Sequence, residues 1–275
     1  KASTPIEVID MGLRGFTRKI GILKDYNANF QCGQCHNAAN RYLTYKWLND
    51  DKPVRPEDLQ KAGVSPYATE FFKDPLESWA WFKSKGWHQG VNGTTGVHYV
   101  NGSDHPHVEI MLQSKHGQAG VTCTDCHFAR KADGKAEHQP SLVKLKVENT
   151  CMRSACHGPG SKSNWTDPGQ ALYTIEAIQQ EYRIRVQKME MAAKDAQRIF
   201  MKLKAGEASL PQEVKEKLET AYEKYLSARD WYLTDLSSGF HDPEGFNRTV
   251  SVVTWELRKT NAAAQSALKK TPVKQ

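Results

Sequence analysis

The last third of the chain carries hydrophobic residues at three- and four-residue spacing, the period of an α-helix with one apolar face. From 170 to 204 this stripe predicts a helix of roughly nine turns. Gly206 and Pro211 then mark the end of that helix and the start of a second one, which extends to about Tyr232. A third helix is predicted over 244–268, after an Asp-Pro pair that suits the N-cap and the first helical position.

The first two thirds of the chain lack such a stripe. Residues 1–31 mix short apolar runs with glycines, which predicts a short helix and loops. A helix is predicted over 40–49, and residues 50–76 form a link punctuated by Pro and Asp. In residues 77–120, four aromatic residues at 79–87 precede five histidines that are separated by Gly and Asn, which favours irregular chain wrapped around a bound group.

All six cysteines lie in three short motifs that each end in histidine. Residues 32–36 and 123–127 read Cys-x-x-Cys-His, and residues 151–157 have the same form with four residues between the cysteines. Cys-x-x-Cys-His is the attachment signature of c-type haem, in which two thiols form thioethers with the porphyrin and the adjacent His binds iron. We predict three covalently bound haems, held by Cys32, Cys35, His36, Cys123, Cys126, His127, Cys151, Cys156 and His157.

Two other uses of these cysteines stay open at this point. Zinc ribbons have ligand spacings similar to those of the four cysteines in the second and third motifs. Exported proteins also use paired cysteines as disulfides. Neither alternative explains why His follows the second Cys in all three motifs. The longer spacer of the third motif can loop out so that both sulfurs reach the porphyrin, and we treat it as a variant haem site.

Composition fits a core in which porphyrins replace part of the usual apolar side chains. Only 39% of the 275 residues are hydrophobic, and no apolar run approaches the length of a membrane span. We predict a mainly α multihaem cytochrome c with a loop-rich haem core and long C-terminal helices. Residues 1–168 would form the three-haem domain, and residues 169–275 a long-helix domain that serves as an oligomer interface.

The formal net charge of +7 first suggests a nucleic-acid partner. However, Lys and Arg are scattered along helices instead of clustering with aromatic residues, and haem propionates also take up basic partners. No nucleic-acid partner is therefore expected. Because c-type haem is attached outside the cytoplasmic membrane, we expect a periplasmic or extracellular protein. The first residues carry no signal-peptide pattern, which is the expectation for a mature chain whose leader has been removed.

Histidines outside the motifs decide what the irons can do. An iron with a second His is closed and suits electron transfer, whereas an iron with an open face can bind a substrate. His116, just before the second motif, and His241, between two predicted helices, are the best second ligands on local grounds. Ten histidines minus the three in the motifs leave seven candidates, namely His88, His98, His105, His107, His116, His138 and His241.

Residues 106–127 carry a sequence of short runs: Pro-His-Val-Glu, then His-Gly, then Gly-Val-Thr-Cys-Thr-Asp-Cys-His. These runs resemble the cytochrome c nitrite reductase family. Residues 32–36 are similar to the third haem site of that family, and residues 237–244 to its C-terminal signature. The resemblance covers most of residues 30–268. It corresponds to the C-terminal three haems of a five-haem enzyme, or of its eight-haem relatives.

The resemblance implies roles for four histidines. His116 would bind the iron of the last haem, and His241 that of the middle haem. His138 matches a histidine that in the family binds a haem of the N-terminal part. His105 matches the active-site histidine that faces the catalytic haem, so it is the one catalytic candidate.

The sequence departs from the family pattern around the catalytic site. The Cys-x-x-Cys-Lys motif of the catalytic haem is absent from the sequence, and the catalytic Tyr falls at Ala39. The Lys and Gln that help hold calcium fall at Gly102 and Asp104, so calcium is not expected. The family's second ligand to the first haem comes from an N-terminal region, and residues 1–31 contain no His.

Two outcomes follow for the first haem. Either a partner chain supplies the missing haems and ligands, or His88, His98, His105 or His107 closes the first haem. In the second case His138 is spare or reaches the haem of a neighbouring molecule.

The leading prediction is an exported three-haem cytochrome with mostly bis-His irons that passes electrons to a redox partner protein. That partner can be another multihaem chain, in a homo- or hetero-oligomer formed through the C-terminal helices. The alternative is one part of a multihaem oxidoreductase for nitrite, hydroxylamine or a sulfur oxyanion, with its catalytic haem on another segment or chain. Stacking into a haem filament is a third reading. The sequence leaves open whether the chain is itself an enzyme.

Overall fold

A computed structural model of the chain describes residues 6–13, 16–23, 28–33, 36, 72–84, 86, 90–100, 105–128, 134–135 and 140–270. All structural statements below concern these residues. Cys35, His88, His138 and the helix predicted over 40–49 lie outside the described residues.

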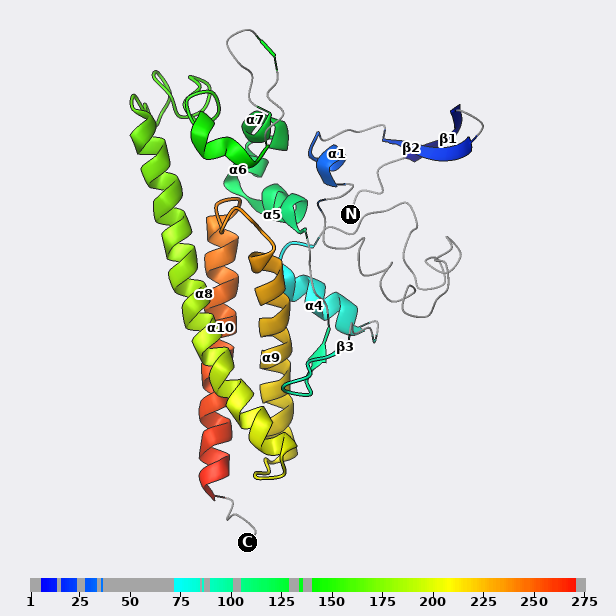
Figure 1. Ribbon diagram of the computed structural model, residues 1–275, viewed down its shortest axis with the longest axis vertical. Helices are drawn as coiled ribbons and strands as arrows, with labels where there is room; N and C mark the ends of the chain where they lie inside the picture. The colour runs from blue at the N-terminus through cyan, green and yellow to red at the C-terminus, as the bar shows by residue number, and fades with distance from the viewer. Residues whose placement is uncertain are drawn as a thin grey trace.

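Three long helices form the body of the molecule (Figure 1). They are α8 (Pro168–Lys204), α9 (Gln212–Leu233) and α10 (Pro243–Lys270), which confirms the three predicted helices and the mainly α fold. Each helix turns one apolar stripe toward the other two, and full burial of one such side chain contributes roughly 1.5–3 kcal/mol. The most deeply buried side chains of this core include Met189, Leu218, Tyr222, Trp231, Val253 and Leu257.

Local signals set where the helices begin and end. The Asp167 side chain accepts a hydrogen bond from the Gly169 N–H at the start of α8. Gly206 follows the end of α8 with a φ of +73°, a conformation that favours glycine. Asp242 accepts the Gly245 N–H at 3.1 Å, so it is the N-cap predicted for α10.

A smaller layer packs against α9. It consists of α4 (Pro75–Ser84) and a two-stranded antiparallel sheet of β3 (Gly90–Val91) and β4 (His98–Tyr99). Phe72, Phe82, Val97 and Val100 from this layer lie in the same hydrophobic core as the long helices. The division into 1–168 and 169–275 stays a prediction.

The expectation of irregular chain over 77–120 was wrong in part. Besides α4 and the β3–β4 hairpin, this segment forms α5 (His107–Gln113) and α6 (Lys115–Gln118). At the start of α4 the Asp74 carboxylate accepts the N–H groups of Leu76 and Glu77, both at 2.9 Å. Asp74 and Pro75 thus repeat the Asp-Pro start signal that was recognised at α10, although the pair falls within the Pro- and Asp-punctuated link predicted over 50–76.

The N-terminal residues also differ from the expected short helix and loops. β1 (Ile6–Leu13) and β2 (Phe16–Leu23) pair antiparallel, with Ile6 opposite Leu23 and Leu13 opposite Phe16. Both runs are rich in Ile, Val or Thr and only two residues separate them, which is a hairpin pattern. A short helix, α1 (Asn29–Gly33), then leads into the first motif, as predicted.

The motif-bearing segments are short and gather near one end of the helical body, where α9 connects to α10 (Figure 1). α1 carries Cys32, α7 (Cys123–His127) is the second motif, and a 3₁₀-helix, η1 (Pro140–Lys146), leads into the third. α1 contacts both α5 and α7, and α7 contacts η1. None of the described helices combines the length and the apolar character that a membrane crossing requires.

Candidate functional site

The motif cysteines lie close together although they are far apart in the sequence. Cys32, Cys123, Cys126, Cys151 and Cys156 are free thiols, so the disulfide alternative fails for these five residues. Burial, with Cys32 nearby, raises the pKa of Cys123 to about 12, and burial, with Cys151 nearby, raises that of Cys126 to about 11. Within the described part of the chain, the four thiols of the second and third motifs do not gather tightly enough to hold one zinc ion.

Hydrogen bonds tie the three motifs to one another. The Asn29 side chain, buried in α1, accepts the Cys123 N–H at 2.7 Å. Asp125 accepts the Thr122 N–H at 2.8 Å and pairs with Arg153 of the third motif at 3.2 Å. Burial raises the pKa of Asp125, but these two partners outweigh it and hold the pKa below its usual value. The attachment points are therefore fixed relative to one another by polar contacts.

Two pairs of histidine rings lie at the spacing of ligands to a shared metal ion. The ring centroids of His116 and His157 are 6.0 Å apart, and those of His127 and His241 are 6.1 Å apart. Two imidazoles that each bind one ion through a nitrogen at roughly 2 Å have their centroids about 6 Å apart. These pairs are the ones that the family resemblance implied. Each combines a motif His with a His from elsewhere in the chain.

A close turn between α5 and α6 positions His116. The buried Ser114 caps α6 by accepting the Gly117 N–H at 3.0 Å. A Cβ atom on Gly117 would lie 1.9 Å from the Met111 carbonyl oxygen, so no larger residue fits. The Gly of the His-Gly pair in the sequence is therefore required by this approach of α6 to α5.

In the third motif, a glycine that packs closely against the backbone again follows the histidine, here His157. A Cβ atom on the next residue, Gly158, would lie 1.8 Å from the Met152 carbonyl oxygen. The His157 ring stacks on Trp165 at a centroid distance of 4.6 Å, and its Nδ1 lies 2.9 Å from the Ser163 hydroxyl. Because Nδ1 is engaged, Nε2 is the nitrogen left for a metal ion.

His241 is held by a buried carboxylate on the connection between α9 and α10. Its Nδ1 lies 2.8 Å from Asp235 Oδ1, and its backbone N–H donates to the Ser237 hydroxyl at 3.0 Å. Asp235 is only 2% exposed. Burial raises the pKa of Asp235, but the hydrogen bonds from His241 and Ser237 outweigh it and lower the pKa. Asp235 is therefore an ionised buried group, and Nε2 of His241 is again left for a metal ion.

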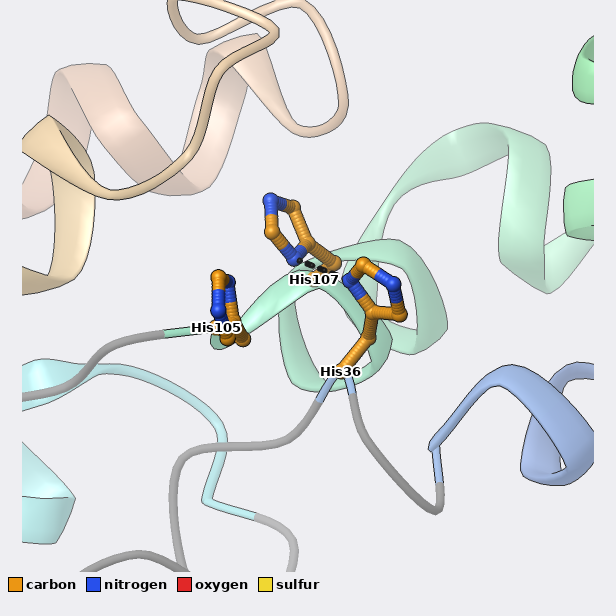
Figure 2. A group of neighbouring side chains, drawn as sticks. All are labelled: His36, His105 and His107. Atoms are coloured by element: carbon orange, nitrogen blue, oxygen red, sulfur yellow. Dashed lines mark hydrogen bonds between the residues drawn. The ribbon is translucent and has the colours of Figure 1, made fainter. Parts of the chain in front are cut away.

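A third group of histidines surrounds the first motif (Figure 2). One nitrogen from each of His36, His105 and His107 lies within 4.8 Å of the others, and the Nδ1 atoms of His36 and His107 are 3.1 Å apart. The Val108 N–H donates to the His36 carbonyl, which joins α5 to the motif. Burial lowers the pKa of His107 to about 4 although Asp235 opposes the shift, so His107 is neutral at pH 7.

The structure separates the tentative ligands of the first haem into two sets. His105 and His107 lie beside His36. His98 lies exposed on β4, outside this group.

Asp235, which contacts His241, was not identified from the sequence. Its one signal is its position six residues before His241, on the same short connection.

The arrangement fits covalently bound haem. In the second and third motifs, two free thiols stand beside a His that has another His at metal-sharing distance. The described residues of the first motif, Cys32 and His36, have two further histidines beside them. These donor sets match what c-type haem needs.

Comparison with known proteins agrees with this chemistry. The family model for cytochrome c552 matches residues 24–275. Cytochrome c-552 of Bacteroides thetaiotaomicron is 26% identical over 138 residues, which cover 46% of this chain and 22% of that protein. The cytochrome c nitrite reductase subunit NrfA of Nitratidesulfovibrio vulgaris is 23% identical over 223 residues, which cover 77% of this chain and 40% of that protein.

A solved structure shares the fold. It is the cytochrome c nitrite reductase from Desulfovibrio desulfuricans, with a TM-score of 0.63 and 20% identity, covering 88% of this chain and 48% of that one. The chain thus spans less than half the length of each of these relatives. Since the family model matches nearly the whole chain, the protein belongs to the cytochrome c552 family, and it is a c-type haem protein with a role in electron transfer or oxidoreduction.

Proposed function

We propose that the chain is an electron-transfer cytochrome with three haems, in which most irons are closed by two histidines. The observation that carries this proposal is the spacing of the His116–His157 and His127–His241 rings, 6.0 and 6.1 Å. When bound, haem supplies an iron that alternates between the ferrous and ferric states. An iron with a His on each face has no open position for a substrate, so these two sites suit electron transfer alone.

The first haem has two candidate second ligands among the described residues, His105 and His107, which both lie beside His36. His36 would bind iron through Nε2, as a motif His does, and its Nδ1 lies against His107, so His107 would lie on the side of the ring away from the iron. His105, with its ring centroid 5.4 Å from that of His36, is then the second ligand that we favour among the described histidines.

Residues of the chain also keep the attachment points together. The hydrogen bond from the Cys123 N–H to Asn29 joins the second motif to α1, and the Asp125–Arg153 pair joins the second motif to the third. Fixed attachment points favour rapid electron transfer because the groups that they carry stay close and change position little.

An activity assay separates the carrier from an enzyme. The haem-loaded chain is reduced with an artificial dye and mixed with nitrite, hydroxylamine or sulfite. We expect no catalytic consumption of dye, because closed irons do not bind these molecules. Sustained turnover would overturn the carrier proposal.

The second candidate function is part of a multihaem oxidoreductase for nitrite, hydroxylamine or a sulfur oxyanion. It is favoured by His105, which is exposed beside the first motif and matches the active-site His of the family resemblance. On this reading turnover would require a further haem on another segment or chain, and His105→Ala would abolish it. His98→Ala, on β4, is the matched control that would leave it unchanged.

The proposal also covers where the protein is located and whether it forms an oligomer. Attachment of c-type haem implies export, so we place the protein in the periplasm or outside the cell, with another redox protein as partner. Large apolar side chains are exposed on α8 and α10, among them Ile184, Met191, Val252 and Trp255. Burial of these side chains would favour an oligomer through the long helices. Sedimentation velocity of the wild type and Trp255→Glu tests this, since only the wild type should associate.

A further inference from the structure

We propose that Asp235 is a positioning residue for the iron ligands of two haems, acting directly on His241 and, through His107, on His36. The inference rests on the proposed function, because it takes His241 and His36 as iron ligands. It adds a shared carboxylate that sets the potentials of the middle and first haems together.

The direct contact is short and fixed. Asp235 Oδ1 lies 2.8 Å from His241 Nδ1. The Ser237 hydroxyl donates to Oδ2 at 2.6 Å, and the Ser237 N–H donates to Oδ1 at 3.1 Å. A carboxylate held by these donors keeps the His241 ring in one orientation and makes its Nε2 a stronger electron donor.

The indirect contact passes through one imidazole ring. His107 Nε2 lies 3.9 Å from Asp235 Oδ1, and on its other side His107 Nδ1 lies 3.1 Å from His36 Nδ1, the contact that Figure 2 marks with a dashed line. The first distance exceeds a direct hydrogen bond, so the carboxylate acts there by its charge or through a bridging water. The His107 ring also meets the His241 ring edge-on, with centroids 5.8 Å apart.

The proton positions are consistent along this path. If His36 binds iron through Nε2, its Nδ1 carries the proton and donates to His107 Nδ1. A neutral His107 then carries its own proton on Nε2, the nitrogen that faces Asp235. Both iron ligands therefore direct an Nδ1–H toward the same carboxylate, one directly and one through His107.

Within the described part of the chain, no Lys or Arg balances the charge of Asp235. Its ion-pair partners there are His241 and His107. A buried charge acts more strongly than one in water. Because ferric iron carries one more positive charge than ferrous iron, the carboxylate favours the ferric state and lowers the potential. The last haem lacks this effect, since His157 Nδ1 meets the neutral hydroxyl of Ser163.

The test is a spectroscopic redox titration of the haem-loaded chain carrying Asp235→Asn. Asn keeps the shape and an acceptor oxygen but removes the charge. The middle haem should become easier to reduce, with its reduction equilibrium shifted at least tenfold, which is about 59 mV for one electron. The first haem should shift less in the same direction, and the last haem should not shift.

Two further variants locate the effect. Asp195→Asn, on α8, removes another carboxylate whose ion-pair partner is Arg198, and it should move none of the three potentials. His107→Phe keeps a ring but breaks the path, so adding Asp235→Asn to it should shift only the middle haem. A shift of the first haem that survives His107→Phe would overturn the role of His107.

The outcomes distinguish this inference from the proposed function. Three closed haems in the wild type with unshifted potentials in Asp235→Asn would overturn the inference and leave the carrier function standing. An open middle iron in the wild type would overturn both. If Asp235→Asn yields no haem-loaded protein, Asp235→Glu decides, because it displaces the charge without removing it. Its potentials should shift in the same direction by less, and unshifted potentials would overturn the inference.

Discussion

Three of the proposed iron ligands share one feature at the scale of single residues: a neighbour occupies Nδ1. Nδ1 of His36 contacts His107, Nδ1 of His157 contacts the Ser163 hydroxyl, and Nδ1 of His241 contacts Asp235. A partner at Nδ1 fixes the tautomer and turns Nε2 toward the metal ion. Asp235 is the one charged partner of the three, so the histidines are not equivalent as electron donors even though the motifs look alike in sequence.

Replacing His116 by Ala should open one iron of the three. The removed ring is the one whose centroid lies 6.0 Å from that of His157, so the last haem loses its second ligand and becomes high-spin. Electron paramagnetic resonance should show one new high-spin signal, and added imidazole should remove it. His98→Ala serves as the control and should keep the wild-type spectrum. A fully low-spin His116→Ala protein would contradict the pairing.

Gly117→Ala tests whether the close turn positions His116. The new methyl group would lie 1.9 Å from the Met111 carbonyl oxygen, so α6 must move. We expect a loss of about 1–3 kcal/mol in the free energy of unfolding, together with a weakened low-spin signal from the last haem. Gly93→Ala is the matched control, because nothing lies within 4 Å of its added methyl group. Equal stability of the two variants would count against this account.

The residues that carry the chemistry were predictable only in part. The spacing of Cys and His predicted the attachment sites, and the family resemblance supplied the pairs His116–His157 and His127–His241. The contacts of Asp235 were not predictable, because they depend on α5 lying beside the connection between α9 and α10. No local pattern in the sequence indicates that His107 and Asp235 face each other.

At the scale of elements, length decided which predictions succeeded. The stripes of α8, α9 and α10 repeat over many turns, so their period is unambiguous. The short elements α4, α5 and the β1–β2 hairpin offer too few residues for a period to show. Their start and turn signals were present, as at Asp74 and Pro75, but that pair falls within the Pro- and Asp-punctuated link predicted over 50–76.

Leu257→Ala measures how much packing in the helical core contributes to the free energy of unfolding. This side chain of α10 is fully buried among the long helices, so its truncation leaves a cavity. Unfolding of the haem-loaded chain in denaturant should show a loss of about 2–5 kcal/mol. Val252→Ala, on the exposed face of α10, should change the stability by less than about 0.5 kcal/mol. A small loss at Leu257 would mean that bound haem and not helix packing dominates stability.

At the scale of the whole molecule, stability should depend on pH through Asp230. Burial raises the pKa of this carboxyl group to about 7 in the folded protein, above its value in the unfolded chain. The unfolded chain therefore loses this proton first as the pH rises, and the free energy of unfolding falls between about pH 4 and pH 7. Asp230→Asn should remove this fall and be more stable than the wild type at pH 7.5 but not at pH 4. Parallel pH profiles of the two proteins in denaturant would contradict the shift.

The described residues form a helical body and a cluster of short motif-bearing segments, and different interactions stabilise the two parts. The body is stabilised by apolar packing, whereas polar contacts such as Asn29–Cys123 and Asp125–Arg153 join the motif-bearing segments. With two pairs of histidine rings at ligand spacing, this division fits a protein whose irons exchange electrons without binding substrate.

The most direct test is electron paramagnetic resonance of the oxidised protein, combined with a count of covalent haems by intact mass. The electron-carrier account predicts a mass increase of three haems and low-spin signals only, unchanged by nitrite or hydroxylamine. A high-spin signal that shifts when either molecule is added would show an open iron. That result would contradict the account and make the chain a substrate-binding oxidoreductase.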